Sequence, residues 1–92
     1  MKTERAVVFF SGHVQGVGFR FTCRGLAAGF SVTGHVKNLA NGRVELVAEG
    51  ERREVEAFIQ AIREGDLKPF IRQCAMEWQP SMGGWKNFHI EN

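Results

Sequence analysis

The chain has 92 residues, of which 43% are hydrophobic and 24% are charged, and its formal net charge is +2. This composition indicates a globular protein rather than a disordered chain, and the length suits one small domain, which we assign to residues 1–92. The weak net charge argues against a nucleic-acid or membrane-surface partner, and the apolar run 6–10 is too short for a signal peptide or a membrane span, so we expect a cytoplasmic protein.

The first predicted strand covers residues 5–11, because nearly every position in it is apolar. The segment 12–20 follows, with glycines at positions 12, 16 and 18. A glycine-rich loop before a helix start directs several backbone N–H groups toward one point, where the helix dipole favours an anion such as phosphate. Arg20 adds a guanidinium that matches phosphate oxygens. The loop alone is explained equally well as a glycine-rich turn beside a surface arginine.

The remaining elements follow from apolar periodicity. A helix is predicted over 19–28, and we expect Phe19 and Phe21 to pack in the core or at the helix start rather than to stack on a substrate. A half-buried strand over 31–38 and a return strand over 43–49 are joined by Asn41-Gly42, a typical hairpin turn. The other predicted elements are a helix over 51–64, a strand over 74–79 and a short strand over 88–91.

This order predicts an α+β, ferredoxin-like split β-α-β (βαββαβ) sandwich: an antiparallel sheet with two helices on one face and an extra short C-terminal strand. In that topology the first two strands are parallel and separated by the third. Their C-terminal ends, roughly 10 Å apart, meet one edge of the sheet. The loop, Arg20 and Asn38 should therefore share a rim. On this pattern alone, Asn38 is best interpreted as a hairpin residue that satisfies its own backbone.

The cysteines and histidines do not predict a metal or cofactor site. Cys23 and Cys74 lack the spacing of metal ligands, and we expect two free buried thiols in preference to a disulfide. The histidines His13, His35 and His89 are far apart and have no acidic partner at ligand spacing. His13 lies in the loop, but its neighbours would not orient it as a base, so we expect it at the rim.

Three segments together resemble the acylphosphatase family: Gly12–Arg20, Gly34–Asn38, and Asn41–Glu45 with Gly50. The combination of Val-Gln-Gly-Val-x-Phe-Arg with a downstream Gly-x-Val-x-Asn is highly specific, and the similarity covers the first two-thirds of the chain. The sequence departs from the family pattern at His35, where an aromatic residue is usual. It also departs after the first and second helices and in the tail that carries the two tryptophans.

The resemblance implies hydrolysis of acyl phosphates to a carboxylate and inorganic phosphate, with Arg20 and Asn38 as catalytic residues. It implies that Arg20 and the backbone of a loop bind phosphate, the loop residues being Gln15, Gly16, Val17, Gly18 and Phe19. Asn38 would orient the attacking water. We expect no cofactor, no metal, survival of activity in chelator, and a monomer. The alternatives are a non-catalytic phosphate- or acyl-phosphate-binding module and, less favoured, a ferredoxin-like RNA-binding domain, which would need aromatic residues on the third strand.

Overall fold

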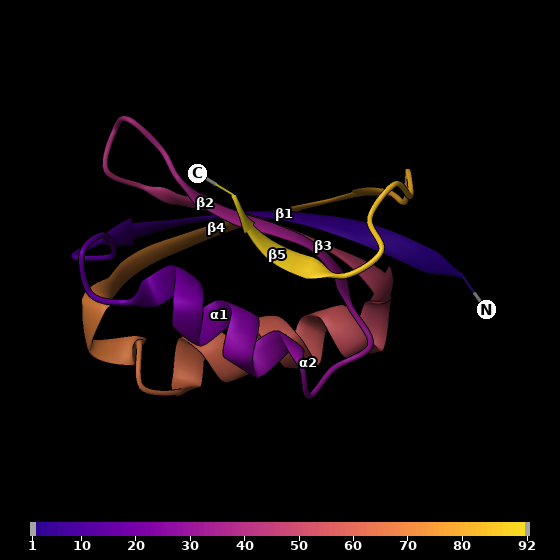
Figure 1. The fold of residues 1–92 in the computed structure, drawn as a ribbon, viewed down its shortest axis with the longest axis horizontal. Helices are drawn as coiled ribbons and strands as arrows, with labels where there is room; N and C mark the ends of the chain where they lie inside the picture. The colour runs from indigo at the N-terminus through magenta and orange to yellow at the C-terminus, as the bar shows by residue number, and fades with distance from the viewer. Residues whose placement is uncertain (1, 92) are drawn as a thin grey trace.

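The protein is described by a computed structural model that covers residues 2–91. Two helices cover one face of a five-stranded sheet (Figure 1), which confirms the ferredoxin-like prediction. The elements in chain order are β1 (Thr3–Gly12), α1 (Phe19–Ala27), β2 (Thr33–Asn38), β3 (Val44–Glu51), α2 (Arg52–Glu64), a 3-10 turn (Lys68–Phe70), β4 (Ile71–Pro80) and β5 (Phe88–Glu91). No helix within residues 2–91 is long and apolar enough to cross a membrane.

The sheet has the strand order β4-β1-β3-β2-β5 and is mixed rather than purely antiparallel. The first four strands pair antiparallel, as predicted, but β5 lies parallel to β2, with Gly34 opposite Phe88. The strand β5 runs parallel to its neighbour β2 because the chain leaves β4 at one edge of the sheet and crosses to the far edge before it forms β5. The strand predicted over 74–79 is longer than expected, since β4 pairs with β1 along most of its length.

The core lies between the sheet and the two helices. The four apolar residues that recur at helical spacing along α2 are all buried: Val55, Phe58, Ile59 and Ile62. On α1, Phe19 and Cys23 are buried, and the Phe19 ring lies 5.1 Å from that of Phe10 on β1. The prediction of core packing is wrong for Phe21, whose surface is 64% exposed. Consecutive helical residues are about 100° apart, so Phe21 is turned roughly 200° from the buried Phe19.

The uncovered face of the sheet contains a buried carboxylate that holds the loop before β5. Glu49 is 5% exposed and accepts hydrogen bonds from Arg5 Nε at 2.7 Å and Ser81 Oγ at 3.0 Å. It also accepts from the amides of Met82 at 2.8 Å and Gly83 at 2.9 Å. Burial alone raises the pKa of Glu49, but these four donors outweigh it and hold the pKa below its usual value.

We expect Glu49→Gln to destabilise the fold by about 2–4 kcal/mol at neutral pH, because an arginine and two amides lose a charged acceptor. In the wild type this contribution is complete above the pKa of the unfolded carboxyl, about 4.3, and is lost as the pH falls through the lower folded pKa. Urea unfolding at neutral and acid pH measures the difference between the two proteins. A difference that stays constant or grows in acid would contradict this role.

The loop after β1 and the end of β2 lie at the same end of the sheet. Phe10 on β1 and Asn38 on β2 are both register partners of Val44 on β3. Figure 1 shows the loop that follows β1 and the β2–β3 turn at one end of the sheet, with the N-terminus at the other. The predicted rim therefore exists, with β3 between its two sides.

Candidate active site

A pocket of about 160 Å³ lies at this rim between the loop, the start of α1 and the end of β2. Its lining residues are Val14, Gly16, Gly18, Phe19, Arg20, Phe21 and Asn38. The structure thus brings Arg20 and Asn38 into one pocket, as the topology predicts. Gln15 and Val17, whose backbone was expected to bind phosphate with the rest of the loop, are not among the residues that line the pocket. Of the described lining residues, Arg20 alone carries a charge.

The backbone at the start of α1 suits an anion. Gly16 and Gly18 have φ values of 79° and 76°, in the left-handed region that favours glycine. A Cβ at either position would meet no other atom within 4 Å, so the backbone conformation rather than crowding requires glycine. Gly18 is the N-cap of α1, no side chain caps this end, and no acidic residue occupies the first turn. The positive end of the helix therefore remains uncompensated beside Arg20.

The Asn38 carboxamide contributes a buried acceptor to the pocket. Among residues 2–91, Asn38 Oδ1 is buried and no protein group donates a hydrogen bond to it. A buried acceptor without a partner costs about 1–3 kcal/mol, so its retention points to a role in binding. The hairpin interpretation of Asn38 is wrong, because Asn41 has that role: its Oδ1 accepts from the Arg43 amide at 3.0 Å. Asn38 therefore lines the pocket with a carboxamide whose oxygen no described protein group uses as an acceptor.

The Gln15 side chain connects the two sides of the site, a role that the sequence did not reveal. Its Nε2 donates to the carbonyl oxygens of Leu39 at 2.8 Å and Arg43 at 3.0 Å. These carbonyls flank the β2–β3 turn, immediately after Asn38. The amide therefore ties the glycine loop to the hairpin that positions the Asn38 carboxamide.

Other reactive side chains are placed elsewhere or are inert. His13 lines a separate hollow with Phe70 and Arg72, and its amide donates to the Phe70 carbonyl at 2.9 Å. Burial raises the pKa of the Cys23 thiol to about 12, which makes it a poor nucleophile. Within residues 2–91, no group of three or more His, Cys, Asp or Glu side chains could hold a metal ion. The polar groups of the described residues that line the pocket are therefore the loop backbone, the Arg20 guanidinium and the Asn38 carboxamide.

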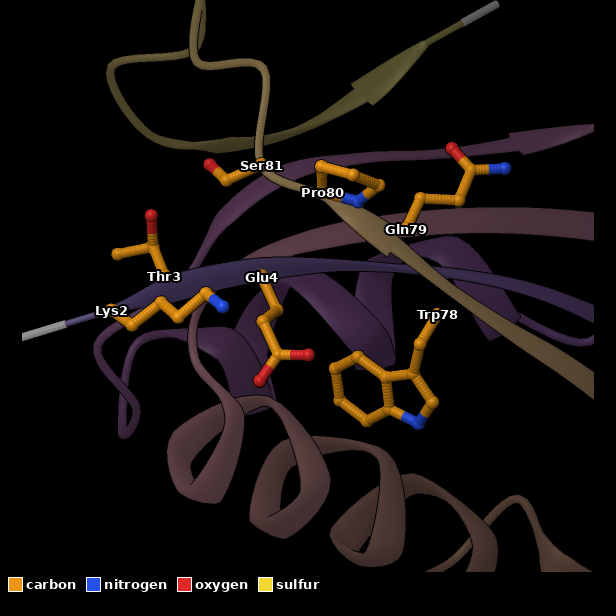
Figure 2. Close-up of a pocket in the computed structure, with 7 residues that line it drawn as sticks. All are labelled: Lys2, Thr3, Glu4, Trp78, Gln79, Pro80 and Ser81. Atoms are coloured by element: carbon orange, nitrogen blue, oxygen red, sulfur yellow. The ribbon is translucent and has the colours of Figure 1, made fainter.

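A larger hollow, of about 590 Å³, lies at the other end of the sheet. Figure 2 shows it between the start of β1 and the end of β4, with the Trp78 side chain pointing from β4 toward α2. Arg52 lies over the Trp78 ring at 4.1 Å and pairs with Glu4 at 3.0 Å. Because β1 spans the sheet, this hollow is roughly 25–30 Å from the glycine loop. The charged groups beside this hollow are engaged in a cation–π contact and an ion pair, and they do not form an anion-binding site.

Comparison with known proteins decides the family. A model of the Acylphosphatase family matches residues 6–90, a range that includes the glycine loop, Arg20 and Asn38. The chain belongs to the acylphosphatase family. It is 39% identical to an acylphosphatase of Roseiflexus sp. over 90 residues, covering 98% of this chain and 97% of that protein. The acylphosphatase of Thermobifida fusca is 36% identical over 88 residues, with coverage of 96% and 97%.

The crystal structure of the acylphosphatase from Bacillus subtilis superimposes with a TM-score of 0.88 at 30% identity, covering 97% of this chain and 99% of that one. Family membership and fold together make this chain an acylphosphatase-type enzyme that hydrolyses acyl phosphates. The alternative of a non-catalytic binding module is not favoured. The RNA-binding alternative is not favoured either, because β3 carries no aromatic residue.

Proposed function

We propose that the pocket beside Arg20 and Asn38 holds the phosphoryl group of an acyl phosphate and directs water to it. The loop amides, of which those of Gly16, Gly18 and Phe19 belong to residues that line the pocket, and the Arg20 guanidinium would surround the phosphoryl oxygens, and Asn38 would orient the water. The observation that carries this assignment is that Asn38, whose Oδ1 is buried without a protein donor among residues 2–91, lines the same pocket as Arg20. That oxygen accepts a water proton in a hydrogen bond and thereby turns the water lone pair toward phosphorus.

The chemistry needs little beyond this positioning. Water attacks phosphorus, the bond from phosphorus to the acyl oxygen breaks, and the carboxylate leaves with the electron pair. The water proton passes to a phosphoryl oxygen of the substrate, because no described lining residue is Asp, Glu or His. The transition state is loose, with charge spread over the equatorial oxygens, and the fixed amides and guanidinium stabilise that charge. A carboxylate is a good leaving group and requires no general acid.

The activity is tested with benzoyl phosphate, by following the release of inorganic phosphate in buffer containing EDTA. Hydrolysis should saturate with substrate, persist in the chelator and be inhibited competitively by added phosphate. Absence of turnover would contradict the proposal, and turnover that disappears in EDTA would contradict a mechanism without metal.

We propose further that residues 1–92 act as one monomeric domain in the cytoplasm, without a nucleic-acid partner. Cys23 and Cys74 are both free thiols, in keeping with a reducing compartment. Light scattering after size exclusion tests the monomer.

We expect Gln15→Met to lower both stability and turnover, since methionine keeps the shape but donates no hydrogen bond. Two carbonyls lose their donor, which costs about 1–3 kcal/mol of unfolding free energy. The loop and hairpin also lose their connection, and kcat should fall by about tenfold through misplacement of Asn38. Gln60→Met on the exposed face of α2 is the matched control. If Gln15→Met lowered stability and left the kcat of the folded enzyme unchanged, Gln15 would be structural only.

A further inference from the structure

Phe21 is an exposed aromatic ring at the edge of the phosphoryl pocket. It follows Arg20 on the first turn of α1, is 64% exposed and lines the pocket. The other large apolar side chains that are exposed within residues 2–91, Met76 and Met82, lie on β4 and on the loop after it. A single exposed apolar side chain needs no explanation in general, but Phe21 is apolar surface beside a charged site.

The volume of the pocket indicates where the rest of the substrate must lie. About 160 Å³, roughly the volume of five water molecules, accommodates a phosphoryl group, a water and a small acyl group, but not an aromatic acyl group in addition. In-line displacement places the attacking water and the leaving oxygen on opposite sides of phosphorus. Asn38 lies at the end of a strand and its Oδ1 is buried, whereas Phe21 is turned toward solvent. A water held by Asn38 therefore directs the acyl group outward, toward Phe21.

The Phe21 ring is held by a neighbour on its own helix. The Arg24 guanidinium lies over it, 5.2 Å from the ring centroid, three residues further along α1. A cation over one face restricts the ring and leaves its other face and edge for a ligand. The arrangement offers a fixed apolar surface at the solvent side of the pocket.

We propose that Phe21 forms the acyl-binding surface of this site and selects acyl phosphates with an apolar, preferably aromatic, acyl group. The inference rests on the proposed function of the pocket. A planar aromatic acyl group gains binding free energy by packing on the Phe21 ring, whereas an acetyl group is too small to cover the ring. Aromatic contacts are worth about 0.5–1.5 kcal/mol, which corresponds to roughly two- to tenfold in kcat/KM.

The test compares benzoyl phosphate with acetyl phosphate in the wild type, Phe21→Ala, Phe21→Leu and Met82→Ala. Phe21→Ala should lower kcat/KM for benzoyl phosphate by about five- to tenfold, mostly through a higher KM. It should leave kcat/KM for acetyl phosphate nearly unchanged. Phe21→Leu should recover part of the loss, and inhibition by inorganic phosphate should not change. Met82→Ala, the control for loss of exposed apolar surface, should match the wild type with both substrates.

Equal losses with both substrates, or no loss with either, would overturn the role of Phe21 while leaving the proposed function in place. A wild type that hydrolyses neither substrate would overturn both. Thermal unfolding of each variant establishes that the compared proteins are folded, and because Phe21 is exposed we expect little change in Tm.

Discussion

Replacing Arg20 with alanine is expected to abolish acyl phosphate hydrolysis, with kcat/KM falling by about 10³-fold or more. Among the described residues that line the pocket, Arg20 alone carries a charge, so the substituted pocket would retain only the dipoles of the backbone and of the Asn38 carboxamide. Inhibition by inorganic phosphate should be lost in parallel, since a guanidinium with the proposed role would contact the ground state and the transition state alike. Steady-state kinetics with benzoyl phosphate and a phosphate inhibition series measure both effects.

Two variants distinguish the effect of losing the Arg20 guanidinium from the effect of losing one positive charge. Arg63→Ala removes the same charge from the exposed last turn of α2 and should leave turnover unchanged. Arg20→Lys keeps a positive charge but loses the planar fork, and it should recover only part of the activity. An Arg20→Ala protein that still bound phosphate as tightly as the wild type would exclude the proposed cradle.

Replacing Asn38 with alanine is expected to lower kcat by about 10²-fold while phosphate inhibition remains close to that of the wild type. In the proposed mechanism the carboxamide orients the attacking water and does not contact the phosphoryl oxygens, so phosphate binding and turnover should be affected separately. Stability should not fall, because within residues 2–91 no protein group donates to the Oδ1 atom that is removed. Kinetics together with urea unfolding measure both quantities on the same preparation.

Asn41→Ala is the matched control for Asn38→Ala. It removes a carboxamide three residues away, whose oxygen accepts a hydrogen bond within the turn. This variant should lose about 0.5–1.5 kcal/mol of stability and keep its turnover, the reverse of the result for Asn38→Ala. Parallel losses of stability and turnover in Asn38→Ala would instead mark Asn38 as a structural residue.

The sequence predicted the fold well where periodicity was strong. The apolar face of α2 and the antiparallel pairing of β1, β3 and β2 were predicted correctly from alternation and from the Asn41-Gly42 turn. The direction of β5 was not predictable, because a four-residue strand carries the same alternation whether it pairs parallel or antiparallel. The full length of β4 was also missed, since its exposed positions are polar and its pairing with β1 is a tertiary contact.

At the site, topology alone predicted that the loop, Arg20 and Asn38 meet, and the structure places both side chains in one pocket. The Gln15 contacts were not predictable, because they reach carbonyls 24 and 28 positions away. For Phe21, apolar character suggested the core, but the helix start at Phe19 fixes which side of α1 each ring occupies. The start of this helix was predicted correctly, so the angular position of Phe21 around α1, on the side opposite the buried Phe19, decides that it lies at the pocket and not in the core.

Val44 is the register partner of both Phe10 and Asn38, so the position of Asn38 in the pocket depends on the register in which β1, β3 and β2 pair. A slip of one residue between β2 and β3 would turn the Asn38 carboxamide to the opposite face of the sheet while leaving the glycine loop intact. The pairing of β1 with β3 closes a long stretch of chain, and such nonlocal contacts form slowly. Catalytic competence is therefore acquired with the nonlocal pairing of the inner strands and cannot precede it, although the loop that we propose to bind the phosphoryl group is local in sequence.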